Sequence, residues 1–120
     1  MRRMLHTIEF SRGDVVLVNF MFSEGTGSKR RPAVLVSSQI YLQGRQEAVL
    51  CAITSNTERL LTGDYLMADW DSAGLLYRSV ATGIIRTIKQ SMIQRKLGTV
   101  SRRDMDAIDD LLRANLDLVD

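Results

Sequence analysis

Residues 13–38 read GDVVLVNFMFSEGTGSKRRPAVLVSS and contain the pattern that decides the fold. Residues 13–20 are rich in β-branched and aromatic side chains, which favour an extended strand. A loop rich in glycine and serine follows, and residues 32–38 are typical of a second strand. Pro32 suits the first position of that strand, where no backbone donor is required, and favours an extended backbone at the preceding residue. The stretch therefore predicts two strands joined by a loop that ends in three consecutive cations, Lys29, Arg30 and Arg31.

The rest of the chain continues this β pattern until its last twenty residues. Apolar and β-branched runs predict strands at residues 47–54, 63–70, 80–88 and 92–100. Residues 71–79 fit a turn of helix, and residues 89–91 fit a short connection. Beyond them, Ser101 followed three residues later by Asp104 forms a variant of the capping box that starts helices. Apolar residues then recur at spacings of three and four, which predicts an amphipathic helix with Met105, Ile108, Leu111, Leu112 and Leu116 on one face.

These elements predict a mainly β fold with a C-terminal α-helix. The fold class is a small antiparallel β-barrel with short helices and one amphipathic helix packed on it. The 120 residues suffice for a single domain, 1–120, in which residues 1–10 form a flexible N-terminal extension. No apolar run is long enough for a membrane helix and no signal-peptide pattern is present, so we expect a cytoplasmic protein.

The composition excludes two kinds of site and indicates the charge of a binding partner. With one cysteine, Cys51, and one histidine, His6, the chain has neither an internal disulfide nor a Cys/His zinc set. We expect Cys51 to be a core residue and no cofactor or metal to be required. Residues 101–120 carry three arginines against six aspartates, so the net charge of +2 leaves +5 on residues 1–100. A basic body favours an anionic partner.

Arginines and hydroxyls are the remaining candidate groups, because nucleotide-binding glycine motifs are absent and a serine or cysteine hydrolase would need a histidine base. RNA cleavage can use such groups alone, since the ribose 2′-hydroxyl of the substrate is itself the nucleophile. Arginine neutralises charge on phosphoryl oxygens but stays protonated and is a poor base. Arg31 is the best-placed cation, Thr54 ends a strand at a polar turn, and Glu24 is a candidate for acid–base work. Each also has an ordinary alternative, as a surface ion pair, a turn cap and a solvated carboxylate.

Taken together, the segments RGDVVLVNF, RRPAVLVSS, AITS and IRTIKQSMIQRKLG, followed by the capped helix, resemble the MazF/PemK family of toxin endoribonucleases from Arg12 to Leu118. The resemblance implies an SH3-like barrel, a homodimer, and cleavage of single-stranded mRNA that leaves a 2′,3′-cyclic phosphate and a 5′-hydroxyl. It implies that Arg31 and Thr54 form the catalytic pair. It also suggests RNA contacts by Lys29, Arg30, Ser55 and Arg86.

The resemblance further implies a cognate antitoxin that covers the RNA groove. The chain departs from the family at Gly83-Ile84-Ile85, where members often carry an aspartate–glutamine pair, so the cleaved sequence cannot be transferred. Two alternatives stay open. One is a non-catalytic toxin of the same fold that binds and poisons DNA gyrase, although its C-terminal tryptophan–glycine–isoleucine ending is absent. The other is a silent small barrel that acts as a binding module.

Overall fold

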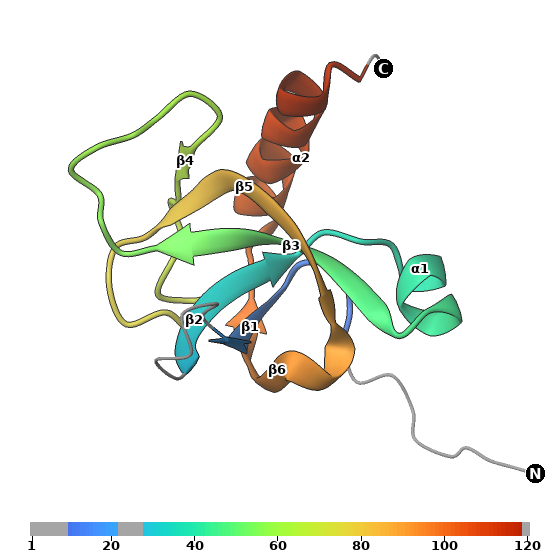
Figure 1. Ribbon diagram of the computed structural model, residues 1–120. Coiled ribbons are helices and arrows are strands. Elements are labelled where there is room, and N and C mark those ends of the chain that lie inside the picture. The colour runs from blue at the N-terminus through green and yellow to red at the C-terminus, as the bar shows by residue number, and fades with distance from the viewer. Residues whose placement is uncertain (1–9, 22–27, 119–120) are drawn as a thin grey trace, which may run out of the picture.

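The computed structural model describes residues 10–21 and 28–118, and its main feature is one antiparallel six-stranded sheet (Figure 1). The strands are β1 (Asp14–Met21), β2 (Ser28–Leu35), β3 (Glu47–Thr54), β4 (Tyr65–Leu66), β5 (Val80–Lys89) and β6 (Ile93–Thr99). The helical segments are α1 (Gln39–Gly44), the 3-10 turn η1 (Gln90–Met92) and α2 (Arg102–Leu116). The strand order is β4-β5-β3-β2-β1-β6, and within the described residues β4 and β6 do not pair with each other. The predicted fold class is confirmed, as a strongly bent sheet rather than a closed barrel.

Each face of the sheet covers its own hydrophobic core. Successive side chains of a strand point to opposite faces, and along β1 Val15 belongs to one core and Val16 to the other. Helix α2 covers the first core with Ile108 and Leu111, while α1 contributes Leu42 to the second. In Figure 1 the two helices lie at different ends of the curved sheet. No helix in the described ranges is long and apolar enough to cross a membrane.

Strand β2 starts earlier than the sequence pattern predicted. It begins at Ser28 rather than at Pro32, because the residues from Ser28 onwards pair with β1. Pairing with β3 begins only at Ala33. Pro32 therefore lies where the strand has one partner, and its missing N–H group is tolerated there. The basic triplet belongs to this strand and not to the loop.

Two other segments differ from the prediction. Residues 71–79 form turns instead of helix, in which the N–H groups of Ala73 and Leu75 both donate to the Trp70 carbonyl at 3.2 Å. The predicted strand at residues 63–70 shortens to the two residues of β4. Helix α1 was not predicted. The sequence feature that marks its start is the N-cap residue Ser38, whose hydroxyl accepts a hydrogen bond from the Tyr41 N–H at 3.1 Å.

The start of α2 is held by a buried carboxylate. Ser101 caps the helix as predicted, since its hydroxyl accepts from the Asp104 N–H at 3.1 Å. The Asp104 side chain does not complete a capping box. It is fully buried and accepts from the Tyr65 hydroxyl at 2.5 Å and from the backbone N–H groups of Ala68 and Asp69 at 3.0 and 2.8 Å. Burial and the bond to Asp104 raise the pKa of Tyr65 to about 12.

The loop between β4 and β5 touches β6 backbone to backbone. A Cβ atom placed on Gly98 would lie 2.3 Å from the Ala73 carbonyl oxygen, and one on Gly74 would lie 2.1 Å from the Leu97 carbonyl oxygen. Gly74 also has a φ of +88°, which side-chain-bearing residues rarely adopt. Because only glycine fits at this approach, the two glycines fix the loop against β6.

Replacing the buried carboxylate tests its contribution. We expect Asp104→Ala to lower the free energy of unfolding by about 3 kcal/mol, because three part-buried donors lose their common acceptor and the buried side chain is lost. Urea denaturation measures the change. The control is Asp106→Ala on the same helix, where an exposed carboxylate makes only a 3.8 Å ion pair with Arg102 and the expected change is below about 0.5 kcal/mol. Equal losses in the two variants would contradict a special role for Asp104.

The backbone contact is tested by adding single methyl groups. We expect Gly98→Ala to destabilise the protein by about 2 kcal/mol or more, because the loop must move away from β6. Gly44→Ala is the matched control, since a Cβ at that helical position has no neighbour within 4 Å and restricts the unfolded chain. Thermal unfolding of the two variants should therefore shift the midpoint down for Gly98 and leave it level or higher for Gly44.

Candidate functional site

A groove crosses the molecule where the ends of β2 and β3, the loop before β5 and strand β6 meet. It has a volume of about 530 Å3. Its described lining combines four cations, several hydroxyl groups and an apolar floor: Lys29, Arg30, Arg31, Arg95, Thr54, Ser55, Tyr77, Ser79, Leu17, Pro32, Ile53, Gly74, Leu75, Leu76 and Leu97. The predicted residues Arg31, Thr54, Lys29, Arg30 and Ser55 thus share one groove.

The strand register explains why Arg31 and Thr54 meet at this groove. Strands β2 and β3 pair through Leu35–Leu50, Val34–Cys51 and Ala33–Ala52. Arg31 and Thr54 each lie two residues beyond the last of these pairs, Ala33–Ala52, and side chains two residues apart in a strand lie on the same face. The two residues are far apart in sequence, and the pairing of their strands brings them to one end of the sheet.

The cations of the groove have no acidic partners among the residues that the structure describes. Lys29, Arg30, Arg31 and Arg95 are exposed, and none forms an ion pair with a described carboxylate. The described lining contains neither aspartate nor glutamate. Four cations around one groove attract anions, and arginine in particular binds phosphate through its planar fork of donors.

Thr54 adds an oriented hydroxyl. Its Oγ1 accepts a hydrogen bond from the Asn56 N–H at 3.1 Å, which is the turn-capping role that the sequence also allowed. An accepting hydroxyl keeps its own hydrogen available for donation. Thr54 is therefore suited to donate to an anion in the groove.

The sequence interpretation did not name Arg95, and it considered Tyr77 only as one of three tyrosines that could stack on bases. Arg95 lies opposite Leu17 in the β1–β6 pairing, and Leu17 lies opposite Pro32 in the β1–β2 pairing. The row of Arg95, Leu17 and Pro32 crosses β6, β1 and β2. It depends on the pairing of β1 with β6, a long-range contact that no local pattern indicates. Tyr77 lies in a segment for which we had expected a turn of helix. The sequence feature that could have indicated a contact surface is the adjacent pair Leu76-Tyr77, which the structure shows to be exposed.

The remaining predicted residues lie elsewhere. Arg86 does not belong to the described lining, and its guanidinium carbon lies 4.6 Å from the centroid of the Phe20 ring. Its predicted RNA contact stays a prediction. Glu24 and His6 lie outside the described residues. Cys51 is fully buried in the core as expected, and burial raises the pKa of its thiol to about 11.

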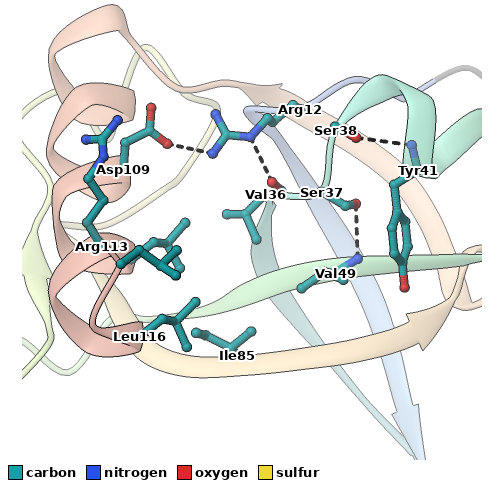
Figure 2. Close-up of a pocket in the computed structure, with 12 residues that line it drawn as sticks. Arg12, Val36, Ser37, Ser38, Tyr41, Val49, Ile85, Asp109, Arg113 and Leu116 are labelled. Carbon is teal, nitrogen blue, oxygen red and sulfur yellow. Dashed lines mark hydrogen bonds and ion pairs between the residues drawn. The ribbon is translucent and has the colours of Figure 1, made fainter. Parts of the chain in front are cut away.

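A second hollow, of about 440 Å3, lies between α2, α1 and the neighbouring strands (Figure 2). Its polar groups already serve the fold. The Arg12 side chain bridges the Asp109 carboxylate at 2.6 Å and the Val36 carbonyl at 2.7 Å, and the Ser37 hydroxyl accepts from the Val49 N–H at 3.1 Å. Figure 2 shows these bonds running between the elements that the hollow separates. The polar groups of this hollow hold helices and strands together, whereas the first groove presents cations that have no acidic partner in the part of the chain that the structure describes.

Structural comparison finds several proteins with the same fold. The chain matches a mycobacterial endoribonuclease in complex with its cognate antitoxin at 24% identity and a TM-score of 0.71, over 91% of this chain and 96% of the other. It matches a MazE–MazF structure from Deinococcus radiodurans at 18% identity and a TM-score of 0.77, over 95% and 100% of the two chains. For the Mycobacterium tuberculosis toxin MazF-mt6 the values are 18% and 0.71, over 88% and 98%. Comparison with curated protein sequences finds no match.

The family model agrees with the fold. Residues 11–116 match the model described as PemK-like, MazF-like toxin of type II toxin–antitoxin system. This range contains every described strand and the whole of α2. The chain therefore belongs to the family of PemK-like and MazF-like toxins of type II toxin–antitoxin systems.

Proposed function

We propose that the protein is an endoribonuclease toxin that cleaves single-stranded RNA in the groove between β2, β3 and β6. The observation that carries the proposal is the set of four exposed cations without described acidic partners around the Thr54 hydroxyl. Family membership and the endoribonuclease activity of the mycobacterial structural relatives support it. A polyanion with phosphates along its length is the ligand that such a lining favours.

The proposed reaction uses the substrate's own nucleophile. The ribose 2′-oxygen attacks the adjacent phosphorus and loses its proton, while the bond from phosphorus to the 5′-oxygen breaks and that oxygen takes up a proton. The products are a 2′,3′-cyclic phosphate and a 5′-hydroxyl. Arg31 stabilises the charge that grows on the phosphoryl oxygens and assists proton transfer, and Thr54 donates its hydroxyl hydrogen to a phosphoryl oxygen or orients the 2′-hydroxyl.

The other groove residues position the strand. Lys29, Arg30 and Arg95 contact backbone phosphates, which fixes the RNA without reading its bases. Ser55 follows Thr54 directly and supports it with a second hydroxyl. Glu24 remains the predicted acid–base group of the loop between β1 and β2.

Cleavage assays on purified variants test the catalytic pair. Wild-type protein should cut a long single-stranded RNA at discrete sites in the presence of EDTA. Arg31→Ala and Thr54→Val should each lower the cleavage rate by about a hundredfold or more, as expected when a donor to the transition state is lost. Arg102→Ala removes an exposed arginine of α2 outside the groove and should cut at the wild-type rate.

The chemical nature of the cleaved ends and the absence of cleavage each test the proposed reaction. Cyclic phosphate at the new 3′ ends distinguishes attack by the 2′-hydroxyl from hydrolysis by water. Absence of cutting on many diverse RNAs by folded wild-type protein would sink the proposal, and inhibition of DNA gyrase by the same sample would favour the alternative toxin class. Retained cleavage in Arg31→Ala would remove that residue from the mechanism.

We also propose two protein partners. One is a second copy of the chain, and the other is a cognate antitoxin whose acidic segment occupies the cationic groove. The support is family membership and the antitoxin complexes of the mycobacterial and Deinococcus relatives. Light scattering should give twice the chain mass of 13.5 kDa, and the antitoxin encoded beside this toxin should block RNA cleavage. A monomer that cleaves RNA at full rate would contradict the dimer.

A further inference from the structure

Leu76 and Tyr77 form an exposed apolar shelf on the wall of the groove. Their exposed fractions are 82% and 68%, whereas the exposed fractions of Leu75 before them and Ser79 after them are only 8% and 3%. Large apolar side chains on a water-facing surface are normal singly, but an adjacent pair beside a cationic groove indicates a contact surface. The shelf and the cations line the same groove, the shelf from the loop before β5 and the cations from strands β2 and β6.

The backbone under this shelf is held at both ends. Before it, Gly74 is packed against the Leu97 carbonyl of β6. Behind it, the Ser79 hydroxyl donates to the Tyr77 carbonyl at 2.7 Å, and the Ser79 carbonyl accepts from the Met67 N–H at 3.0 Å. The shelf is therefore presented to the groove in a defined position, which lowers the entropy cost of binding a ligand there.

The Tyr77 side chain makes no hydrogen bond and no cation–π contact with any described residue. By contrast, Arg45 lies over the Tyr41 ring at 5.3 Å, and the Tyr65 hydroxyl is bonded to Asp104. Of the three tyrosines, Tyr77 is therefore the one for which the described residues provide neither a hydrogen-bond partner nor a cation over the ring. An aromatic ring in this state, next to cations that attract phosphate, suits a flat aromatic ligand attached to a phosphate chain.

We infer that the shelf formed by Leu76 and Tyr77 is a stacking platform for an unpaired base of the RNA strand whose phosphates lie along β2 and β6. The inference rests on the proposed function and adds to it the element that selects single strands. In a duplex the bases are already stacked on one another, whereas a single strand can turn one base out onto a protein ring. Stacking accepts any base, so the platform favours unpaired RNA over duplex RNA without choosing a sequence.

Binding of uncleavable probes tests this platform apart from catalysis. The probes are a short 2′-O-methyl oligoadenylate, which lacks the nucleophile, and an abasic oligomer with the same backbone. Wild-type protein should bind the base-bearing probe more tightly than the abasic one. Tyr77→Leu should weaken binding of the base-bearing probe about 5- to 100-fold, the range that follows from the loss of one base–aromatic stack. Its affinity for the abasic probe should stay unchanged.

Two further variants separate stacking from other roles. Tyr77→Phe keeps the ring and should bind as wild type does, whereas a loss equal to that of Tyr77→Leu would assign the effect to the hydroxyl and overturn the inference. Tyr41→Leu changes a tyrosine on α1 that lies outside the groove and should have no effect. Equal losses in Tyr41→Leu and Tyr77→Leu, or wild-type binding by Tyr77→Leu, would also overturn it.

The outcome for the platform can be told apart from that for the nuclease. If wild-type protein cleaves RNA and Tyr77→Leu binds the base-bearing probe normally, the platform is wrong and the proposed function stands. If wild-type protein neither cleaves RNA nor binds either probe, both fail together.

Discussion

The buried carboxylate of Asp104 is the interaction on which the groove depends. It joins the first turn of α2 to the loop that follows β4, because it accepts hydrogen bonds from Tyr65 and from the backbone of Ala68 and Asp69. A buried carboxyl group is costly to leave without donors, so these three bonds hold the helix and the loop to each other. The same loop continues to the Gly74–Gly98 contact and then to the groove wall. The helix therefore positions a site that it does not touch.

The groove gathers four cations without described acidic partners, whereas many cations elsewhere in the described chain form ion pairs. Elsewhere the described arginines and lysines commonly have acidic partners, as in Arg12–Asp109, Arg45–Glu47 and Arg103–Asp69. Lys29, Arg30 and Arg31 on β2 and Arg95 on β6 have none among the described residues, whereas Lys96 on β6 pairs with Asp14 at 3.2 Å. Because these cations are exposed, their mutual repulsion is screened by water and salt and costs the fold little, about 1 kcal/mol for a pair at 4 Å in bulk water. An arriving phosphate chain removes that repulsion and gains the attraction of all four cations at once.

The sequence predicted those features that depend on local pattern. Strand β3 has its predicted bounds, β5 differs by one residue at its end, β6 differs by one residue at each end, and Ser101 caps α2 as expected. Arg31 at a loop-to-strand junction and Thr54 at a strand end were candidates from local position, and the family resemblance implied that they form a pair. The features that were missed depend on partners distant in sequence. Asp104 was interpreted as a helix cap because its acceptor role involves a loop more than thirty residues earlier. Arg95 lies at the groove because β6 pairs with β1, which places Arg95 opposite Leu17.

The state of the polar groups, and not the size of the hollow, distinguishes the functional groove. The two hollows have similar volumes, about 440 and 530 Å3. In the smaller one, the hydrogen bonds of Arg12, Ser37 and Ser38 hold the strands and helices together, so a ligand would have to replace bonds that stabilise the fold. In the larger one, the cations and the Thr54 hydroxyl hydrogen are available without any loss to the fold. A ligand gains polar binding free energy where the folded protein has left donors without acceptors, and among the described residues such donors gather around Arg31.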